Sequence, residues 1–247
     1  MATGSCVADD VTRDLVYGRN AVRELYRGPR DVLETWVTER ASTQIAWLDA
    51  GPRVQIKPER ALSEAAGTRD HQGVVAWCEP FRYADAYELA AGEQPLVVCL
   101  DQVTDPHNLG AVARSAEAAA ATGIVVPAHG SARVTSAVCR ASAGAVEHLP
   151  IAVVPNIARY LAEVKGPSLW AYAAAADGTI EMWDADLADG VALVLGAEGK
   201  GVRPLVRRTC DGAIAIPLAG RVGSLNVSVA AAVLLYEARR QRRRADG

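Results

Sequence analysis

Short apolar runs alternate with amphipathic segments along most of the chain. From residue 96 onward the runs are continuously apolar: LVVCL (96–100), IVVP (124–127), SLWAYAA (168–174), VALVLG (191–196) and AIAIP (213–217). A strand that is apolar on both faces is typical of a parallel sheet covered by helices on both sides. The pattern therefore predicts an α/β fold with a parallel sheet, and helices are expected near 109–121 and 225–243.

The first eighty residues predict a smaller α/β unit. A helical period over 18–27 places Ala21, Val22 and Leu25 on one face. Residues 45–48 are expected in a second helix, and Pro58 is expected to begin a third, because proline suits the first helical position. Strands are expected at 32–37, 54–56 and 73–77.

The segment from Glu79 to Pro95 interrupts this alternation. It contains two prolines, a glycine and several acidic residues, a composition that is common between domains. We therefore expect an N-terminal domain over 1–80, a linker over 81–95 and a second domain over 96–247.

Composition narrows the possible classes of protein. Half of the 247 residues are hydrophobic and 22% are charged, which excludes a disordered chain. No apolar run reaches the roughly eighteen residues of a membrane helix, and the N-terminal MATGSCVADD has no secretory pattern. The five cysteines lack CxxC spacing, so a reducing, cytoplasmic setting without a metal site is expected. The net charge of −3 argues against a strongly basic nucleic-acid coat protein.

Three loops follow strands at the edge where parallel sheets bind ligands. In the first, Asn108 is expected to cap a helix that carries Arg114, and by itself this arginine fits a surface salt bridge better than a functional role. The second holds Gly196, Gly199 and Gly201 around Glu198, so its backbone can turn sharply and approach a ligand. In the third, Ser224 is expected to cap the last helix, with Asn226 in its first turn.

In order, the three loops resemble the three motifs of the SpoU (TrmH) family of RNA ribose 2′-O-methyltransferases. These motifs are N-x-G-x-x-x-R from Asn108, G-x-E-G-x-G from Gly196 and SLNVSVA from Ser224. The segments VYGRNAVRE (16–24) and HQGVVA (71–76) resemble the ribosomal-protein-like RNA-binding domain of bacterial enzymes that methylate a guanosine of large-subunit (23S) rRNA. The resemblance implies a SPOUT-type domain with a trefoil knot, S-adenosylmethionine as the cofactor, and a homodimer.

The resemblance also implies roles for individual residues. Arg114 would be central to catalysis. Because a guanidinium stays protonated in proteins, we expect Arg114 to hold a phosphate and stabilise the developing alkoxide rather than to act as a base. The residues expected to position the ribose are Asn108, Glu198, Ser224 and Asn226. Those expected to line the adenosine pocket are Gly196, Ile216 and Leu225. Those expected to contact RNA are Arg19, Asn20, Arg23, His71 and Gln72.

Two alternatives stay open at this point. The same chemistry could act on tRNA or on a ribosomal site that confers antibiotic resistance, or the chain could be an RNA-binding protein without catalysis. The presence of every motif residue disfavours the second alternative. The five arginines between residues 239 and 244 suit either a solvated helix end or an arm that contacts phosphates.

Overall fold

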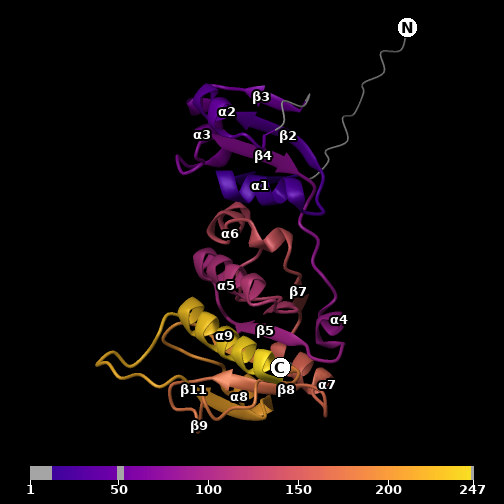
Figure 1. The fold of residues 1–247 in the computed structure, drawn as a ribbon, viewed down its shortest axis with the longest axis vertical. Coiled ribbons are helices and arrows are strands. Elements are labelled where there is room, and N and C mark those ends of the chain that lie inside the picture. Colours follow the sequence, from indigo (N-terminus) through magenta and orange to yellow (C-terminus); the bar gives the residue numbers. More distant parts are fainter. Residues whose placement is uncertain (1–12, 49–52, 246–247) are drawn as a thin grey trace.

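Two β-sheets, one above the other along the long axis of the molecule, build the part of the chain that the structure describes (Figure 1). The structure is a computed structural model, and it describes residues 13–48 and 53–245. The smaller sheet belongs to the N-terminal segment and the larger one to the rest of the chain. The two sheets meet through α1 (Arg19–Arg27) above and α6 (Ser136–Ala141) below.

The N-terminal sheet has the strand order β1-β4-β2-β3. Its strands are β1 (Asp14–Tyr17), β2 (Val32–Val37), β3 (Val54–Ile56) and β4 (Val74–Cys78). Strand β4 is antiparallel to both of its neighbours, whereas β2 and β3 are parallel. Helix α1 buries Ala21, Val22 and Leu25, which confirms the face that the helical period predicted.

Two helix boundaries in this unit differ from the sequence expectation. Helix α2 (Glu39–Gln44) ends before residues 45–48, because Ile45 leaves the helical region with φ −102° and ψ 86°. Pro58 precedes α3 (Glu59–Ala66) as its extended N-cap residue, so the helix starts one residue later than expected. The prediction of a helix over 45–48 is therefore wrong for all four residues, whereas the difference at Pro58 is one residue at a helix end.

The larger sheet is parallel throughout, as its apolar strands predicted. Its strands, in spatial order, are β7 (Ile151–Val154), β6 (Gly123–Pro127), β5 (Leu96–Asp101), β10 (Val191–Gly196), β8 (Trp170–Ala174), β11 (Gly212–Ala215) and β9 (Ile180–Glu181). Every neighbouring pair runs in the same direction. The short strand β9 had no counterpart in the sequence prediction.

Helices cover both faces of this sheet, which explains why its strands are continuously apolar. On one face, α5 (Pro106–Ala118) and α9 (Val227–Ala245) pack against alternate residues such as Val98 and Leu193. On the other face, α4 (Ala86–Ala90), α7 (Ile157–Val164) and α8 (Pro204–Thr209) pack against the intervening residues, such as Val97 and Ala192. Helix α6 and the single-turn helix η1 (Ala145–Glu147) lie outside α5 and contact it.

The segment between the two sheets runs along one side of the molecule and carries α4 (Figure 1). It is attached to the larger sheet before that helix begins, because the backbone N–H of Ala84 donates to Ile151 O at 2.9 Å and Ala84 forms a bridge with Ala152. The division into 1–80, 81–95 and 96–247 stays a prediction, but residues 83–84 are bound to the second unit.

Candidate active site

The ends of three strands bring the three sequence motifs to one edge of the parallel sheet. Strand β5 ends at Asp101, beside Gly196 at the end of β10 in the pairing register. Strand β11 ends at Ala215, and the chain then returns through residues 216–226 to the start of α9. This is the edge at which open parallel sheets bind ligands.

Asn226 links all three motifs through one side-chain amide. Its Nδ2 donates to Asn108 Oδ1 at 3.0 Å and to Glu198 Oε1 at 3.5 Å. Its Oδ1 accepts from the backbone N and the Oγ of Ser228, at 2.9 and 2.6 Å. The contacts with Ser228 fix the direction of the amide, so that its N–H groups face Asn108 and Glu198.

The residues that cap the two helices of the site differ from those expected. Helix α5 begins at Pro106 and its cap is Asp105, whose Oδ1 accepts from His107 N at 2.8 Å. Asn108 therefore lies inside the first turn, where its side chain is free to meet Asn226. At α9 the cap is Asn226 rather than Ser224, since Asn226 Oδ1 accepts from the N–H two residues on.

A buried carboxylate that the sequence analysis did not identify holds the glycine-rich loop in place. Asp101 is fully buried and accepts from Arg203 N at 2.9 Å and from Arg203 Nε at 2.8 Å. This ion pair joins the end of β5 to the end of the loop after β10. An acidic residue closing an otherwise apolar strand was the available signal, but its partner lies 102 residues away.

The glycines of the second loop satisfy a steric requirement. A Cβ on Gly196 would lie 2.0 Å from the carbonyl carbon of Gly201, so no other residue fits there without a backbone shift. Gly199 and Gly201 have φ values of 77° and 65°, a region that L-residues with side chains rarely occupy. The loop closes on itself through Gly201 N, which donates to Ala197 O at 2.8 Å.

A cavity of about 340 Å³ lies beneath this loop. Gly196, Ile216 and Leu225, the three residues expected around the adenosine, all line it, together with Glu198 and Ser224. The rest of the lining is mostly alanine, leucine, isoleucine and glycine. An apolar cavity with few polar groups has the character of a small-molecule site, and such sites begin at about 300 Å³.

Arg114 lies apart from this cluster. It is exposed on α5, is not part of the cavity lining, and its side chain makes no hydrogen bond or ion pair with the described residues 13–48 and 53–245. Asn108 precedes it by six residues, which is about 240° around an α-helix, so the two side chains leave α5 on different sides. The structure thus brings Asn108, Glu198 and Asn226 together but leaves Arg114 outside.

The expected RNA-contacting residues divide into two groups. Arg19 and Gln72 are in contact, since Arg19 N donates to Gln72 Oε1 at 3.0 Å, and Asn20 is exposed beside them. Arg23 instead forms an ion pair with Glu24 at 2.9 Å. Arg19, Asn20 and Arg23 share α1.

His71 is not on the RNA-accessible surface, in contrast to the expectation. Its side chain is 1% exposed, and both ring nitrogens are engaged within the domain. Nε2 contacts Ser63 Oγ at 3.0 Å, and Nδ1 accepts from Gly73 N at 3.0 Å. His71 therefore shapes the turn before β4, and no ring nitrogen is left for RNA.

The described residues form no metal site and no membrane-spanning helix, and the thiols of Cys78 and Cys210 are not activated. Burial raises the pKa of the Cys78 thiol to about 11 and that of Cys210 to about 12, so neither is a thiolate nucleophile at neutral pH. Within 13–48 and 53–245, no three or more His, Cys, Asp or Glu residues are grouped so that they could hold a metal. Among the helices in these ranges, none combines the length and apolar character needed to cross a membrane.

Both halves of the chain match families of RNA methyltransferases. Residues 95–236 match the SpoU rRNA Methylase family, and residues 15–84 match the family described as RNA 2′-O ribose methyltransferase substrate binding. The 23S rRNA (guanosine-2′-O-)-methyltransferase RlmB of Pseudomonas syringae is 41% identical over 239 residues, which are 92% of this chain and 95% of that protein. The RlmB protein of Shewanella oneidensis is 38% identical over 242 residues, which are 94% of this chain and 98% of that protein.

Solved structures are similar over nearly the whole length as well. The SpoU methyltransferase AviRb from Streptomyces viridochromogenes, in complex with AdoMet, is 26% identical with a TM-score of 0.79, covering 93% of this chain and 90% of that one. With its motifs gathered at the carboxyl edge of a parallel sheet and a family match over more than half its length, the chain belongs to the SpoU rRNA methylase family.

Proposed function

We propose that the protein transfers a methyl group from S-adenosylmethionine to a ribose 2′-hydroxyl in RNA, at a guanosine of 23S rRNA. The observation that carries the proposal is the meeting of Asn108, Glu198 and Asn226 beside the apolar cavity under the glycine-rich loop. The relatives named as 23S rRNA guanosine methyltransferases support the choice of substrate.

The cavity fits the proposed cofactor. Gly196 leaves no room for a side chain where the loop closes on itself, and Ile216 and Leu225 supply apolar walls for a flat adenine ring. The cofactor would supply an electrophilic methyl group. Backbone N–H and C=O groups of the loops can bind the polar edge of adenosine, which agrees with a lining that is mostly apolar and includes one charged side chain, Glu198.

The polar cluster would orient the ribose. Asn226 is fixed by Ser228, and in turn it aligns the Asn108 and Glu198 side chains, each of which keeps lone pairs for a hydroxyl group. Aligning two bound reactants can lower the activation barrier by about 7–11 kcal/mol. Arg114 stays protonated, so its proposed work is to hold the adjacent phosphate and stabilise the developing alkoxide, while phosphate or water accepts the proton.

Three features of the family resemblance remain part of the proposal. A trefoil knot is supported by membership of the SpoU family, to which the resemblance assigned it. A homodimer is supported by the exposed Val229 and Tyr236 on α9, which are 48% and 54% exposed. A cytoplasmic location follows from an rRNA substrate.

Mapping the modified nucleotide tests the proposed function. The purified protein, incubated with labelled S-adenosylmethionine and total RNA, is expected to label 23S rRNA, at a guanosine that becomes resistant to alkaline cleavage. The same position should lose its methyl group in RNA from a deletion strain. Labelling of tRNA alone would favour the tRNA alternative, and failure to bind S-adenosylmethionine in calorimetry would contradict the enzyme assignment.

A further inference from the structure

The contact between the N-terminal unit and the methyltransferase unit is a packed interface. One buried apolar cluster continues from Val22 and Leu25 of α1 to Val138 of α6 and Val146 of η1. The backbones approach so closely that a Cβ on Gly28 would lie 2.9 Å from Glu147 Cβ. Glu24 of α1 also contacts His148 Nε2 at 3.0 Å.

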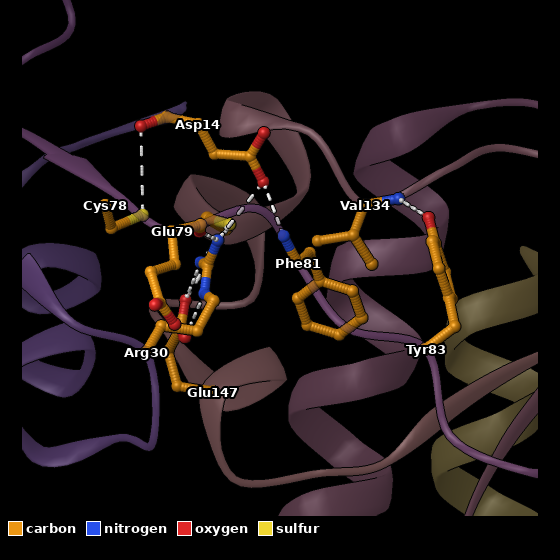
Figure 2. A network of polar contacts seen from close by, with 9 residues as sticks. Asp14, Arg30, Cys78, Glu79, Phe81, Tyr83, Val134 and Glu147 are labelled. Carbon is orange, nitrogen blue, oxygen red and sulfur yellow. Dashed lines mark hydrogen bonds and ion pairs between the residues drawn. The ribbon is translucent and has the colours of Figure 1, made fainter. Parts of the chain in front are cut away.

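Arg30 lies at the centre of this interface and is almost completely buried (Figure 2). Its Nε and Nη2 form a two-pronged ion pair with Glu147, at 2.9 and 2.5 Å, although the two residues lie 117 positions apart. Its Nη1 donates to Asp14 Oδ2 and to Glu79 O, both at 3.2 Å. The remaining N–H of Nη2 faces the Cys139 sulfur at 3.9 Å, so every N–H of the guanidinium has a partner.

The surroundings keep this pair charged and aligned. Burial has the largest single effect and lowers the pKa of Arg30, but the hydrogen bonds and the negative charge of Glu147, with smaller contributions from Cys78 and Cys139, together raise that pKa. Phe81 packs against the guanidinium at 5.5 Å from its ring centroid, and Phe81 N donates to Asp14 Oδ2 at 2.8 Å. Beside the pair, Tyr83 OH accepts from Val134 N at 3.0 Å (Figure 2).

Such a pair is better suited to setting an orientation than to adding stability. Desolvation offsets much of the attraction in a buried ion pair, and apolar side chains of the same volume are often as stabilising. The planar fork of arginine, however, donates two parallel hydrogen bonds to a carboxylate, which restricts the relative orientation of the two groups. Domains in one chain move relative to each other unless their interface prevents it, and this fork supplies such a constraint.

The interface lies directly between the proposed RNA-binding helix and the proposed site. Helix α1, which carries Arg19 and Asn20, forms its upper side. On its lower side, α6 packs on α5 at Gly110, where a Cβ would lie 2.5 Å from Ala141 Cβ. Gly110 is only two residues from Asn108, so the interface and the site share one rigid helix.

We propose that Arg30 and Glu147 are positioning residues that fix the N-terminal unit on the methyltransferase unit, so that bound RNA presents its ribose at a set distance from the methyl-transfer site. This inference rests on the proposed function. The residues act through the arrangement of the domains and touch neither RNA nor cofactor.

Removing the charge of Glu147 tests this role. Glu147→Gln is nearly isosteric, and Glu64→Gln is the matched control because it breaks an exposed ion pair, Arg60–Glu64, that lies wholly within the N-terminal unit. For Glu147→Gln we expect small-angle scattering to show a broader distribution of domain separations. We expect about a 10²-fold slower single-turnover methylation at saturating 23S rRNA fragment, the scale of loss for a misplacement of about 1 Å. Affinity for S-adenosylmethionine should be unchanged, and Glu64→Gln should match the wild type in every measurement.

A second variant disturbs the same interface without altering a charge. Gly28→Ala places a methyl group against Glu147 Cβ, at a φ of −83° that alanine adopts readily. It should reproduce the changes in scattering and in single-turnover rate. Gly166→Ala, which adds a methyl group with no atom within 4 Å, is its control.

The outcomes separate this inference from the proposed function. Wild-type scattering and rate in both Glu147→Gln and Gly28→Ala would overturn the inference, as would open domains with an unchanged rate. If Glu147→Gln does not bind S-adenosylmethionine with full stoichiometry, the variant is not correctly folded. The scattering and rate of Gly28→Ala then test the inference by the same criteria. A wild-type protein that methylates no RNA contradicts the proposed function, and the scattering comparison still decides whether the ion pair fixes the domains.

Discussion

Two side chains at the site each stabilise the local backbone and also hold a distant segment in position. Asn226 caps α9 through Oδ1 and aligns Asn108 and Glu198 through Nδ2. Asp101 ends a strand and anchors the glycine-rich loop through Arg203. Because each of these groups joins segments that are distant in sequence, a change at one residue affects both local stability and the geometry of the site.

Asn226→Ala is expected to lower both the free energy of unfolding and the rate of methyl transfer. Loss of an N-cap costs about 0.5–2 kcal/mol, and Asn156→Ala, which removes the cap of α7, should cost a similar amount. Only Asn226→Ala should also slow methyl transfer, because only this cap contacts Asn108 and Glu198. Urea unfolding and single-turnover methylation measure the two effects. Equal activity of the two variants would refute a role for Asn226 in the site.

Arg114→Ala is expected to lower the rate of methyl transfer by about 10²–10³-fold, by analogy with the loss of an oxyanion donor. S-adenosylmethionine should bind as before, since Arg114 does not line the cavity. Arg114→Lys should also be slow, because lysine lacks the planar fork. Single-turnover rates and calorimetry check this, and a wild-type rate for Arg114→Ala would exclude the role.

Between elements, close helix packing explains the glycine of the first motif. Gly110 allows α5 to approach α6, with Ser142 N 2.9 Å and Val138 O 3.0 Å from the position of an added Cβ. The packed partners are largely backbone atoms, which cannot rotate away as a flexible side chain can. Gly110 is therefore required by the contact between two helices and not by a turn.

Gly110→Ala should destabilise the protein by about 1–3 kcal/mol, the usual cost of an added group in a packed interior. Gly166→Ala is the control, since its added Cβ meets no atom within 4 Å. Urea unfolding followed by circular dichroism measures both. If the two variants unfold at the same midpoint, the close approach of α5 and α6 does not limit the residue at position 110.

At the scale of the whole molecule, Arg114 and the Asn108–Asn226 cluster lie on different sides of α5. A second copy of the chain that supplies one of them would bring both groups to a single reaction. The exposed Val229 and Tyr236 of α9 offer an apolar surface for that second copy.

We expect a dimer of about twice 26.0 kDa at micromolar concentration, measured by light scattering. Mixing Arg114→Ala with Asn226→Ala protein, after brief unfolding and refolding to exchange subunits, should restore part of the activity if the dimer completes each site. A monomer at that concentration would contradict the assembly, and inactive mixed dimers would place both residues in the same protomer's site.

A fragment that starts near Gln94 is expected to bind S-adenosylmethionine and to lose activity on 23S rRNA, because the three motifs lie beyond that point. Calorimetry and methylation assays test this. A fragment that methylates the same nucleotide at the full rate would show that the N-terminal unit does not select the substrate.

The sequence by itself determined the elements that carry the fold and the place of the site. Strands β2 and β10 have the bounds that their apolar runs predicted, and the three motifs lie at the strand ends where ligands were expected. The signal is local, because a buried strand or an amphipathic helix repeats its apolar positions within a few residues. The residues that the family resemblance placed around the adenosine do line one cavity, because the loops that carry them leave β10 and β11 at the same edge of the sheet.

Only the tertiary structure decided how polar groups pair. The helix caps are Asp105 and Asn226, where the sequence predicted Asn108 and Ser224. His71 is buried. Asp101 and Arg30 pair with residues 102 and 117 positions away. A hydrogen bond or ion pair needs one matching group at the right point in space, and this leaves no periodic pattern along the chain. Which polar side chains face the substrate and which hold the protein together therefore depended on the folded packing of the two units.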